Sequence, residues 1–165
     1  MTISLILVLS VFGLLIALYY ARQVSQIPLT QGISDSAEAE RLRKIHDAIS
    51  KGAMAFLTQE YRYMIYFMVA FAVLISFLVD DPHTANLNEG IYTAFSFLLG
   101  AGVSMVSGFI GMKIATIGNA RTTVSAKTSI SKAFQVALQS GAVMGFGLVG
   151  LAVLGLIGVY LMLLV

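Results

Sequence analysis

Four long apolar runs without a charged residue constrain the fold of this 165-residue chain more than any other feature. A helix needs about 20 predominantly apolar residues to cross the roughly 30 Å hydrocarbon core of a bilayer. The sequence therefore predicts an all-α, polytopic membrane protein, in which residues 1–165 form a single membrane domain with four transmembrane helices. The predicted spans are about 3–21, 63–79, 91–112 and 141–165.

The composition agrees with a membrane protein and argues against nucleic-acid binding and against a zinc or haem site. Apolar residues make up 58% of the chain and charged residues only 11%, whereas charged residues are about a quarter of a typical soluble domain. The formal charge of +2 accompanies no nucleic-acid motif, so we expect a lipid bilayer and no nucleic acid as partner. Cysteine is absent, and His46 and His83 do not have the spacing of zinc or haem ligands.

The distribution of lysine and arginine predicts the orientation of the spans. Residues 22–62 hold six basic residues, 80–89 none and 113–132 four. By the positive-inside rule the first and third connections are cytoplasmic, so both chain ends lie outside. We therefore expect an integral, multi-pass protein, N-out and C-out. Its membrane would be the plasma membrane in a prokaryote, or a vacuolar or other acidic-compartment membrane in a eukaryote.

A polar linker at 23–34 leads to a predicted amphipathic cytoplasmic helix over about 36–62. Asp35 is the expected N-cap, and Glu40 with Lys44 is an acid-before-base pair one helical turn apart. No helix breaker precedes the span 63–79, so one continuous helix of about 65 Å is predicted.

Glu60 lies where this helix meets the span, without an opposite charge one turn away. Two interpretations remain for it: a carboxylate that reaches water at the interface, which we favour, or a group on an ion path. The loop at 80–89 contains the pair Asp80 and Asp81. We interpret the pair as solvated loop residues, because two carboxylates without further ligands do not form a magnesium site.

Small residues recur four apart in the third and fourth apolar runs. On a helix this spacing forms two adjacent stripes in the third run, one with Gly100, Ser104 and Gly108 and one with Gly111, where another membrane helix can approach closely. We therefore predict helix packing at Gly100, Ser104, Gly108, Gly111, Gly141 and Gly145.

Residues 113–132 are predicted to form a cytoplasmic connection, with Gly118 as the C-cap that ends the third helix. The segment is basic and contains no acidic residue. Two roles are open for its polar side chains: steering an anionic substrate, or setting topology and contacting anionic lipid, which we favour. The residues concerned are Asn119, Arg121, Lys127 and Lys132.

Three stretches together resemble one family of membrane proteins. They are ISKGAMAFLTQEY (49–61), GFIGMKIATIGNARTT (108–123) and AFQVALQSGAVMG (133–145). In this order and spacing they closely resemble the N-terminal portion of the membrane-bound, ion-translocating inorganic pyrophosphatases, over about 39–150. Three linked motifs are more specific than any single glycine pattern. One departure is the segment 124–126, where many relatives place an acidic residue.

The resemblance implies a homodimer whose subunits each have roughly sixteen helices, in an inner and an outer ring. Such an enzyme hydrolyses pyrophosphate with Mg²⁺ and moves H⁺ or Na⁺ out of the cytoplasm; the ion and any requirement for K⁺ are left open. The acid-rich motifs that hold substrate and metal in the family do not occur here, so no catalytic, cofactor-binding or metal residue is carried over. The four spans would be outer-ring scaffold helices that need the remaining helices of the parent protein, and the chain alone would be inactive.

The chain ends at Val165 within an apolar run, which leads us to expect a larger functional unit. The alternative is a complete four-span structural or assembly subunit without catalytic activity. A small four-span channel is a weaker third possibility, because no span carries a charge near its middle.

Overall fold

The computed structural model describes residues 2–33, 35–79 and 89–164, and these residues form four α-helices and no strand. The helices are α1 (Thr2–Gln26), α2 (Ser36–Leu78), α3 (Glu89–Thr128) and α4 (Ile130–Leu163). Each is long and apolar enough to cross a membrane. The predicted all-α fold with four membrane-spanning helices is confirmed. The acidic loop predicted before Glu89, with Asp80 and Asp81, lies outside the described residues.

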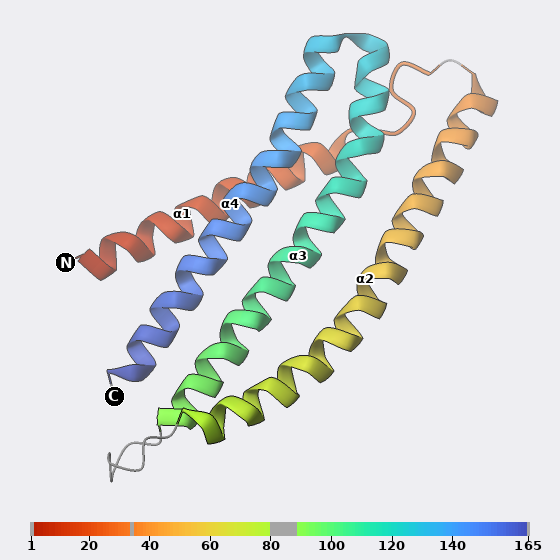
Figure 1. The fold of residues 1–165 in the computed structure, drawn as a ribbon. Helices are drawn as coiled ribbons and strands as arrows, with labels where there is room; N and C mark the ends of the chain where they lie inside the picture. The colour runs from red at the N-terminus through yellow and green to blue at the C-terminus, as the bar shows by residue number, and fades with distance from the viewer. Residues whose placement is uncertain (1, 34, 80–88, 165) are drawn as a thin grey trace.

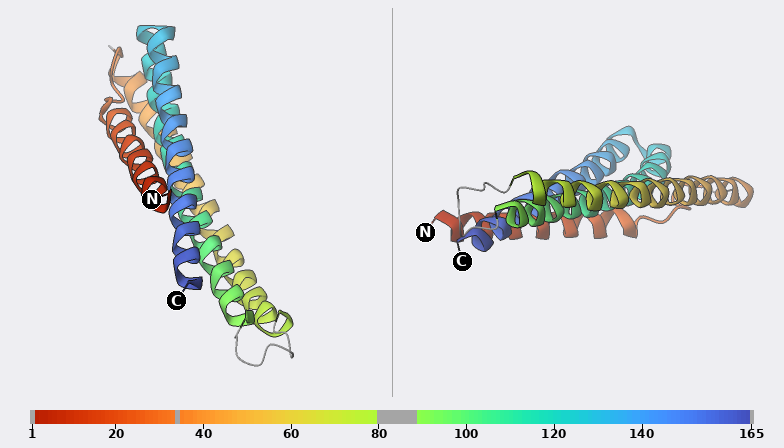
Figure 2. Two further views of the ribbon diagram at one scale, coloured as in Figure 1. Left: turned by 90° about the vertical axis from the view of Figure 1, so that its left-hand side faces the viewer. Right: turned by 60° about the horizontal axis from the view of Figure 1, so that its bottom comes forward.

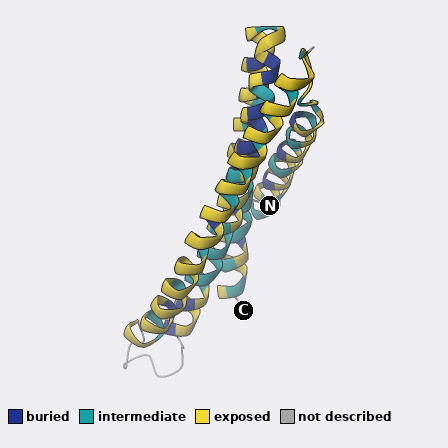
Figure 3. Ribbon diagram, turned by 90° about the vertical axis from the view of Figure 1, so that its right-hand side faces the viewer, coloured by how far each residue is buried: buried dark blue, intermediate teal, exposed yellow. Residues whose placement is uncertain are grey.

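α2, α3 and α4 lie side by side with α3 in the middle, and α1 lies across one face of α4 and reaches α3 near its C-terminal end (Figures 1 and 2). α1 and α3 run towards one end of the molecule, and α2 and α4 run back. α3 packs against both α2 and α4, whereas α1 crosses α4 obliquely. At most 17% of the most apolar window of any helix is buried, and most of the ribbon is exposed (Figure 3). Lipid or other apolar protein surface must cover these faces.

The predicted continuous helix after the first linker is confirmed in α2, which has 43 residues. Its N-cap is Asp35, whose side chain accepts a hydrogen bond of 2.9 Å from the backbone nitrogen of Ala37. Glu40 and Lys44 form the expected ion pair, with 2.7 Å between Oε1 and Nζ. Local signals in the sequence therefore predicted both the N-cap of α2 and an ion pair on its surface.

The prediction that Gly118 ends the third helix is wrong. α3 continues to Thr128, and α4 begins at Ile130 after the single residue Ser129, whose side chain caps it. The segment 113–132 is thus a helical hairpin. Gly118 is buried, and a Cβ added to it would lie 2.3 Å from Oγ of Ser140 in α4. Gly118 therefore allows α4 to pack closely on α3, and it does not end the helix.

α1 packs on α4 through a second close approach. A Cβ added to Gly150 would lie 3.2 Å from the carbonyl oxygen of Ser10 and 2.8 Å from Cγ of Leu14. α1 also extends beyond its apolar run to Gln26, so the polar linker begins later than the sequence indicated. A small core joins α1, α3 and α4, formed by the buried residues Ala17, Val24, Ile114, Val136 and Val143.

Candidate functional site at the basic end of the helices

Most of the polar residues that the sequence singled out lie where α1 and α3 end and α2 and α4 begin (Figure 1). We call this the basic end of the molecule. It consists of the last turns of α1 and α3, the first turns of α2 and α4, and the connections between them. The positive-inside rule predicts this end in the cytoplasm.

Arg121 joins two helices through its guanidinium. Nη2 donates a hydrogen bond of 3.0 Å to the carbonyl oxygen of Ser25 in the last turn of α1, and Nη1 donates one of 3.2 Å to the carbonyl oxygen of Ile117. Nε is buried without a hydrogen-bond partner among the described residues. Burial lowers the pKa of this guanidinium, which lies outside the apolar segment 91–112, but arginine remains charged in proteins. Two backbone carbonyl oxygens therefore stabilise this positive charge through hydrogen bonds.

Lys127 and Glu38 form an ion pair between the last turn of α3 and the first turn of α2. Each charge lies at the helix terminus whose dipole favours it, the cation at a C-terminus and the anion at an N-terminus. Their side chains are 34% and 52% exposed, and exposed pairs contribute about 0–1 kcal/mol. The pair is thus a weak tie between α2 and α3.

An amide pair links α1 to α4 at the same end, and the sequence did not predict it. Gln139 Nε2 donates a hydrogen bond of 3.0 Å to Gln23 Oε1, and Gln23 Nε2 donates one of 2.7 Å to the hydroxyl of Tyr19. The available signal was two amides at the ends of apolar helices, where an unpaired amide is costly. Their pairing depends on how α1 lies against α4, which one sequence does not reveal.

Three other candidates stay outside this network in the described part of the chain. Asn119 is exposed and, with His46, lines a cavity of about 100 Å³ between α2 and α3. The side chain of Lys132 is exposed, and its backbone nitrogen donates to Oγ of Ser129 at 3.1 Å. Glu60 is exposed on α2. Functional roles for these three residues stay predictions.

Tyr61, next to Glu60, joins the middle of α2 to α3. Its hydroxyl donates a hydrogen bond of 2.5 Å to the carbonyl oxygen of Met105. Gly108 leaves the space for this hydroxyl, because a Cβ added there would lie 2.7 Å from it. The interhelical hydrogen bond and the missing side chain therefore belong to one contact.

The six predicted packing residues have different surroundings. Gly108 lies against Tyr61, and a Cβ on Gly111 would lie 3.2 Å from Cε of Met144 in α4. A Cβ on Gly100, Gly141 or Gly145 would meet nothing within 4 Å, and Ser104 lines a groove. Helix packing at the residues that face open space stays a prediction.

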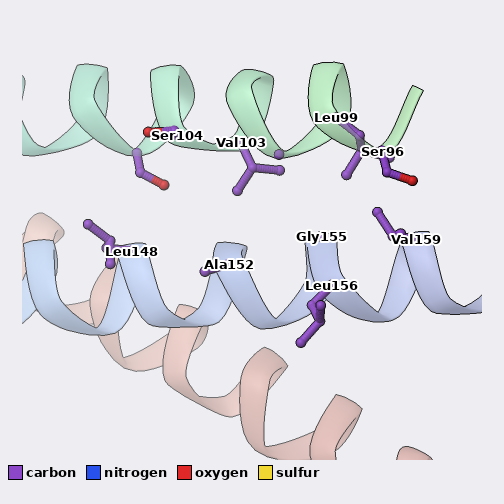
Figure 4. Close-up of a pocket in the computed structure, with 11 residues that line it drawn as sticks. Ser96, Leu99, Val103, Ser104, Leu148, Ala152, Gly155, Leu156 and Val159 are labelled. Atoms are coloured by element: carbon purple, nitrogen blue, oxygen red, sulfur yellow. The ribbon is translucent and has the colours of Figure 1, made fainter. Parts of the chain in front are cut away.

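The groove beside Ser104 lies between α3 and α4, away from the basic end (Figure 4). It encloses about 450 Å³, and its walls include Leu99 and Val103 of α3 and Leu148 and Ala152 of α4. No lining residue is titratable. The groove can accept an apolar group but offers no acid, base or charged ligand for chemistry.

The described residues do not fit a magnesium site. No group of three or more histidine, aspartate or glutamate side chains lies close enough to hold a metal ion in the described ranges. Magnesium bound to pyrophosphate needs several carboxylate oxygens placed together. We therefore derive no catalytic step through a metal on these helices.

Four long apolar helices and a basic end define an integral, multi-pass membrane protein. The family is shown by the sequence: the family model described as inorganic H⁺ pyrophosphatase matches residues 11–165. The chain belongs to this family, as the three motifs predicted.

Several curated relatives are similar along most of this chain. A putative K(+)-stimulated pyrophosphate-energized sodium pump of Bacteroides thetaiotaomicron is 34% identical over 159 residues, which are 96% of this chain and 20% of that protein. A K(+)-insensitive pyrophosphate-energized proton pump of Methanosarcina mazei is 35% identical over 130 residues, which are 79% of this chain and 18% of that protein. A putative K(+)-stimulated sodium pump of Clostridium tetani is 40% identical over 140 residues, 84% of this chain and 19% of that protein. The chain therefore spans about a fifth of the length of the relatives it matches. No solved structure gives a significant match.

Proposed function

We propose that this chain supplies scaffold helices to a membrane pyrophosphatase that couples Mg²⁺-dependent hydrolysis of pyrophosphate to the export of H⁺ or Na⁺. The observation that carries the proposal is the family match over 11–165. The relatives are named as pyrophosphate-energized pumps, and both proton and sodium pumps occur among them. K(+)-stimulated and K(+)-insensitive pumps are also both among these relatives.

The scaffold role is supported by what the described helices carry. Phosphoryl chemistry is mainly positioning and charge neutralisation by metal ions, lysine and arginine. Arg121 instead donates to backbone carbonyls, and Lys127 is paired with Glu38. Much of the helix surface is exposed (Figure 3), and many of the exposed side chains are large and apolar. Such faces are suited to contact with further helices of the parent protein, with a second subunit of a homodimer and with lipid. In this arrangement the basic end faces the cytoplasm.

Inverted membrane vesicles that contain the natural full-length protein provide the test. We expect Mg²⁺-dependent release of phosphate from pyrophosphate, together with quenching of a pH-sensitive dye for H⁺ or uptake of radioactive sodium for Na⁺. The 165-residue chain, purified alone in detergent, should release no phosphate above the background of the same detergent solution without the protein.

Two outcomes would contradict the proposal. Hydrolysis by the 165-residue chain alone would place an active site on these helices. If vesicles contain the natural full-length protein in folded form but do not hydrolyse pyrophosphate, the alternative of a structural subunit without catalytic activity would be favoured. As a control for the scaffold role, Glu60→Gln and Asn119→Ala in the full-length protein should leave the KM for pyrophosphate unchanged.

A further inference from the structure

The C-terminal end of α1 favours a positively charged hydrogen-bond donor, because its last carbonyl groups lack intrahelical partners. The last four carbonyl groups of a helix have no intrahelical donors and together carry about half a negative charge. α1 has no basic residue in its last turn. One of its terminal acceptors is the carbonyl oxygen of Ser25, which receives the 3.0 Å hydrogen bond from Arg121 of α3.

The chemistry of Arg121 matches this task. A guanidinium offers several donors in a fixed plane, so it can reach the end of α1 while a second arm holds its own helix. Its Nε is buried without a partner among the described residues. A charge that is partly removed from water is costly unless it is hydrogen-bonded. The two hydrogen bonds to carbonyl oxygens therefore fix the position of the Arg121 side chain and, at the same time, the end of α1.

The connection after α1 also lies on α3. Gly32 has φ of +73°, a conformation that side chains rarely adopt, and a Cβ built on it would lie 3.4 Å from Oγ1 of Thr128 and 3.8 Å from Cβ of Lys127. At the start of α2, Glu38 pairs with Lys127. Bonds to α3 therefore lie on both sides of this connection: the hydrogen bond from Arg121 to Ser25 precedes it, and the ion pair of Lys127 with Glu38 follows it.

We propose that Arg121 is a positioning residue that caps α1 from a neighbouring helix and thereby fixes the end of α1 and its connection to α2 on α3. Otherwise α1 packs mainly on α4, through Gly150 and the pair Gln139 with Gln23. Arg121 adds a direct hydrogen bond between α1 and α3. This role differs from steering an anionic substrate, and it goes beyond the pump function without depending on it.

The test is hydrogen–deuterium exchange on the natural full-length protein in lipid nanodiscs, comparing Arg121→Met and Arg121→Lys with the unmodified protein. Methionine keeps much of the apolar stem but removes every donor. Loss of a charge-assisted hydrogen bond at a helix end should speed amide exchange in residues 22–33 on the order of tenfold. Exchange in residues 140–150 of α4 should remain unchanged. Lysine keeps the charge and can reach one carbonyl, so Arg121→Lys should restore part of the protection.

Lys132→Met is the matched control, because it removes an exposed positive charge at the same end. It should leave exchange in residues 22–33 unchanged. The proposal is overturned if Arg121→Met exchanges like the unmodified protein in 22–33, or if Arg121→Lys behaves the same as Arg121→Met. A raised KM for pyrophosphate with unchanged exchange in 22–33 would likewise overturn it and assign Arg121 to substrate steering. The exchange readout remains valid even if the protein does not hydrolyse pyrophosphate.

Discussion

Replacing Gly108 with alanine should destabilise the contact between α2 and α3 by a mechanism that a second substitution can remove. The added Cβ would lie 2.7 Å from the hydroxyl of Tyr61 but 3.9 Å from its Cζ. The hydroxyl cannot stay where it is, so its 2.5 Å hydrogen bond to Met105 is lost or the helices separate. Tyr61→Phe removes only the oxygen and leaves a ring at ordinary contact distance.

The sizes of the effects decide which term dominates. Overpacking typically costs about 1–3 kcal/mol, while an interhelical hydrogen bond in a membrane is worth about 0.6 kcal/mol on average. Alanine gains up to about 1 kcal/mol over glycine in a helix. We therefore expect Gly108→Ala alone to cost about 1–2 kcal/mol, and Tyr61→Phe alone about 0.6 kcal/mol.

The double variant should be no less stable than Tyr61→Phe alone, because the clash is gone and the gain in helix propensity remains. This corresponds to a coupling energy of about 1–2 kcal/mol between the two sites. The measurement is a double-mutant cycle on the natural full-length protein, unfolded by SDS titration in mixed micelles and followed by circular dichroism. Additive costs in the double variant would refute the steric argument, since independent sites add.

Substitutions at three further contacts are tested by the same unfolding measurement. Gly118→Ala should destabilise the pairing of α3 with α4, because its Cβ would lie 2.3 Å from Oγ and 2.8 Å from Cβ of Ser140. Ser140→Gly should rescue it, whereas Ser140→Ala should rescue little; equal rescue by both would be evidence against this geometry. Gly90→Ala places a Cβ 2.2 Å from the backbone oxygen of Ser76, so it should lower the free energy of unfolding by more than about 2 kcal/mol, and no change of the Ser76 side chain should restore stability. Lys127→Met and Glu38→Gln should each cost about 1 kcal/mol or less, with a coupling that disappears at high salt; a coupling that persists in salt would show a desolvated pair instead.

Local signals in the sequence were sufficient where a single helix decides the outcome. The N-cap Asp35 and the pair Glu40 with Lys44 depend only on residues a few positions apart, and both were predicted. Gly118 shows the opposite case. A glycine after an apolar run and before polar residues has the local pattern of a C-cap, but here it serves the approach of Ser140 from another helix.

The contacts at the basic end were beyond sequence reasoning for the same reason. Arg121 and Ser25 are 96 positions apart, and Gln139 and Gln23 are 116 apart. The sequence indicated a basic segment, which the positive-inside rule explains equally well without any contact. Only the arrangement of α1 beside α3 and α4 shows that one of these basic side chains, Arg121, donates a hydrogen bond to a backbone carbonyl oxygen of another helix.

The central position of α3 explains why its faces could not be assigned from its sequence. A surface helix of a soluble protein shows one apolar stripe, because only one side meets the core. α3 packs on α2 at Gly108 and on α4 at Gly111 and Gly118, while its other sides are apolar and exposed. In a bilayer the lipid-facing sides must be apolar as well, so hydrophobicity is similar around the helix and only residue size distinguishes the contacts. Small residues mark places where a neighbour approaches closely, but they do not say which neighbour it is. For Gly108 that neighbour is the hydroxyl of Tyr61.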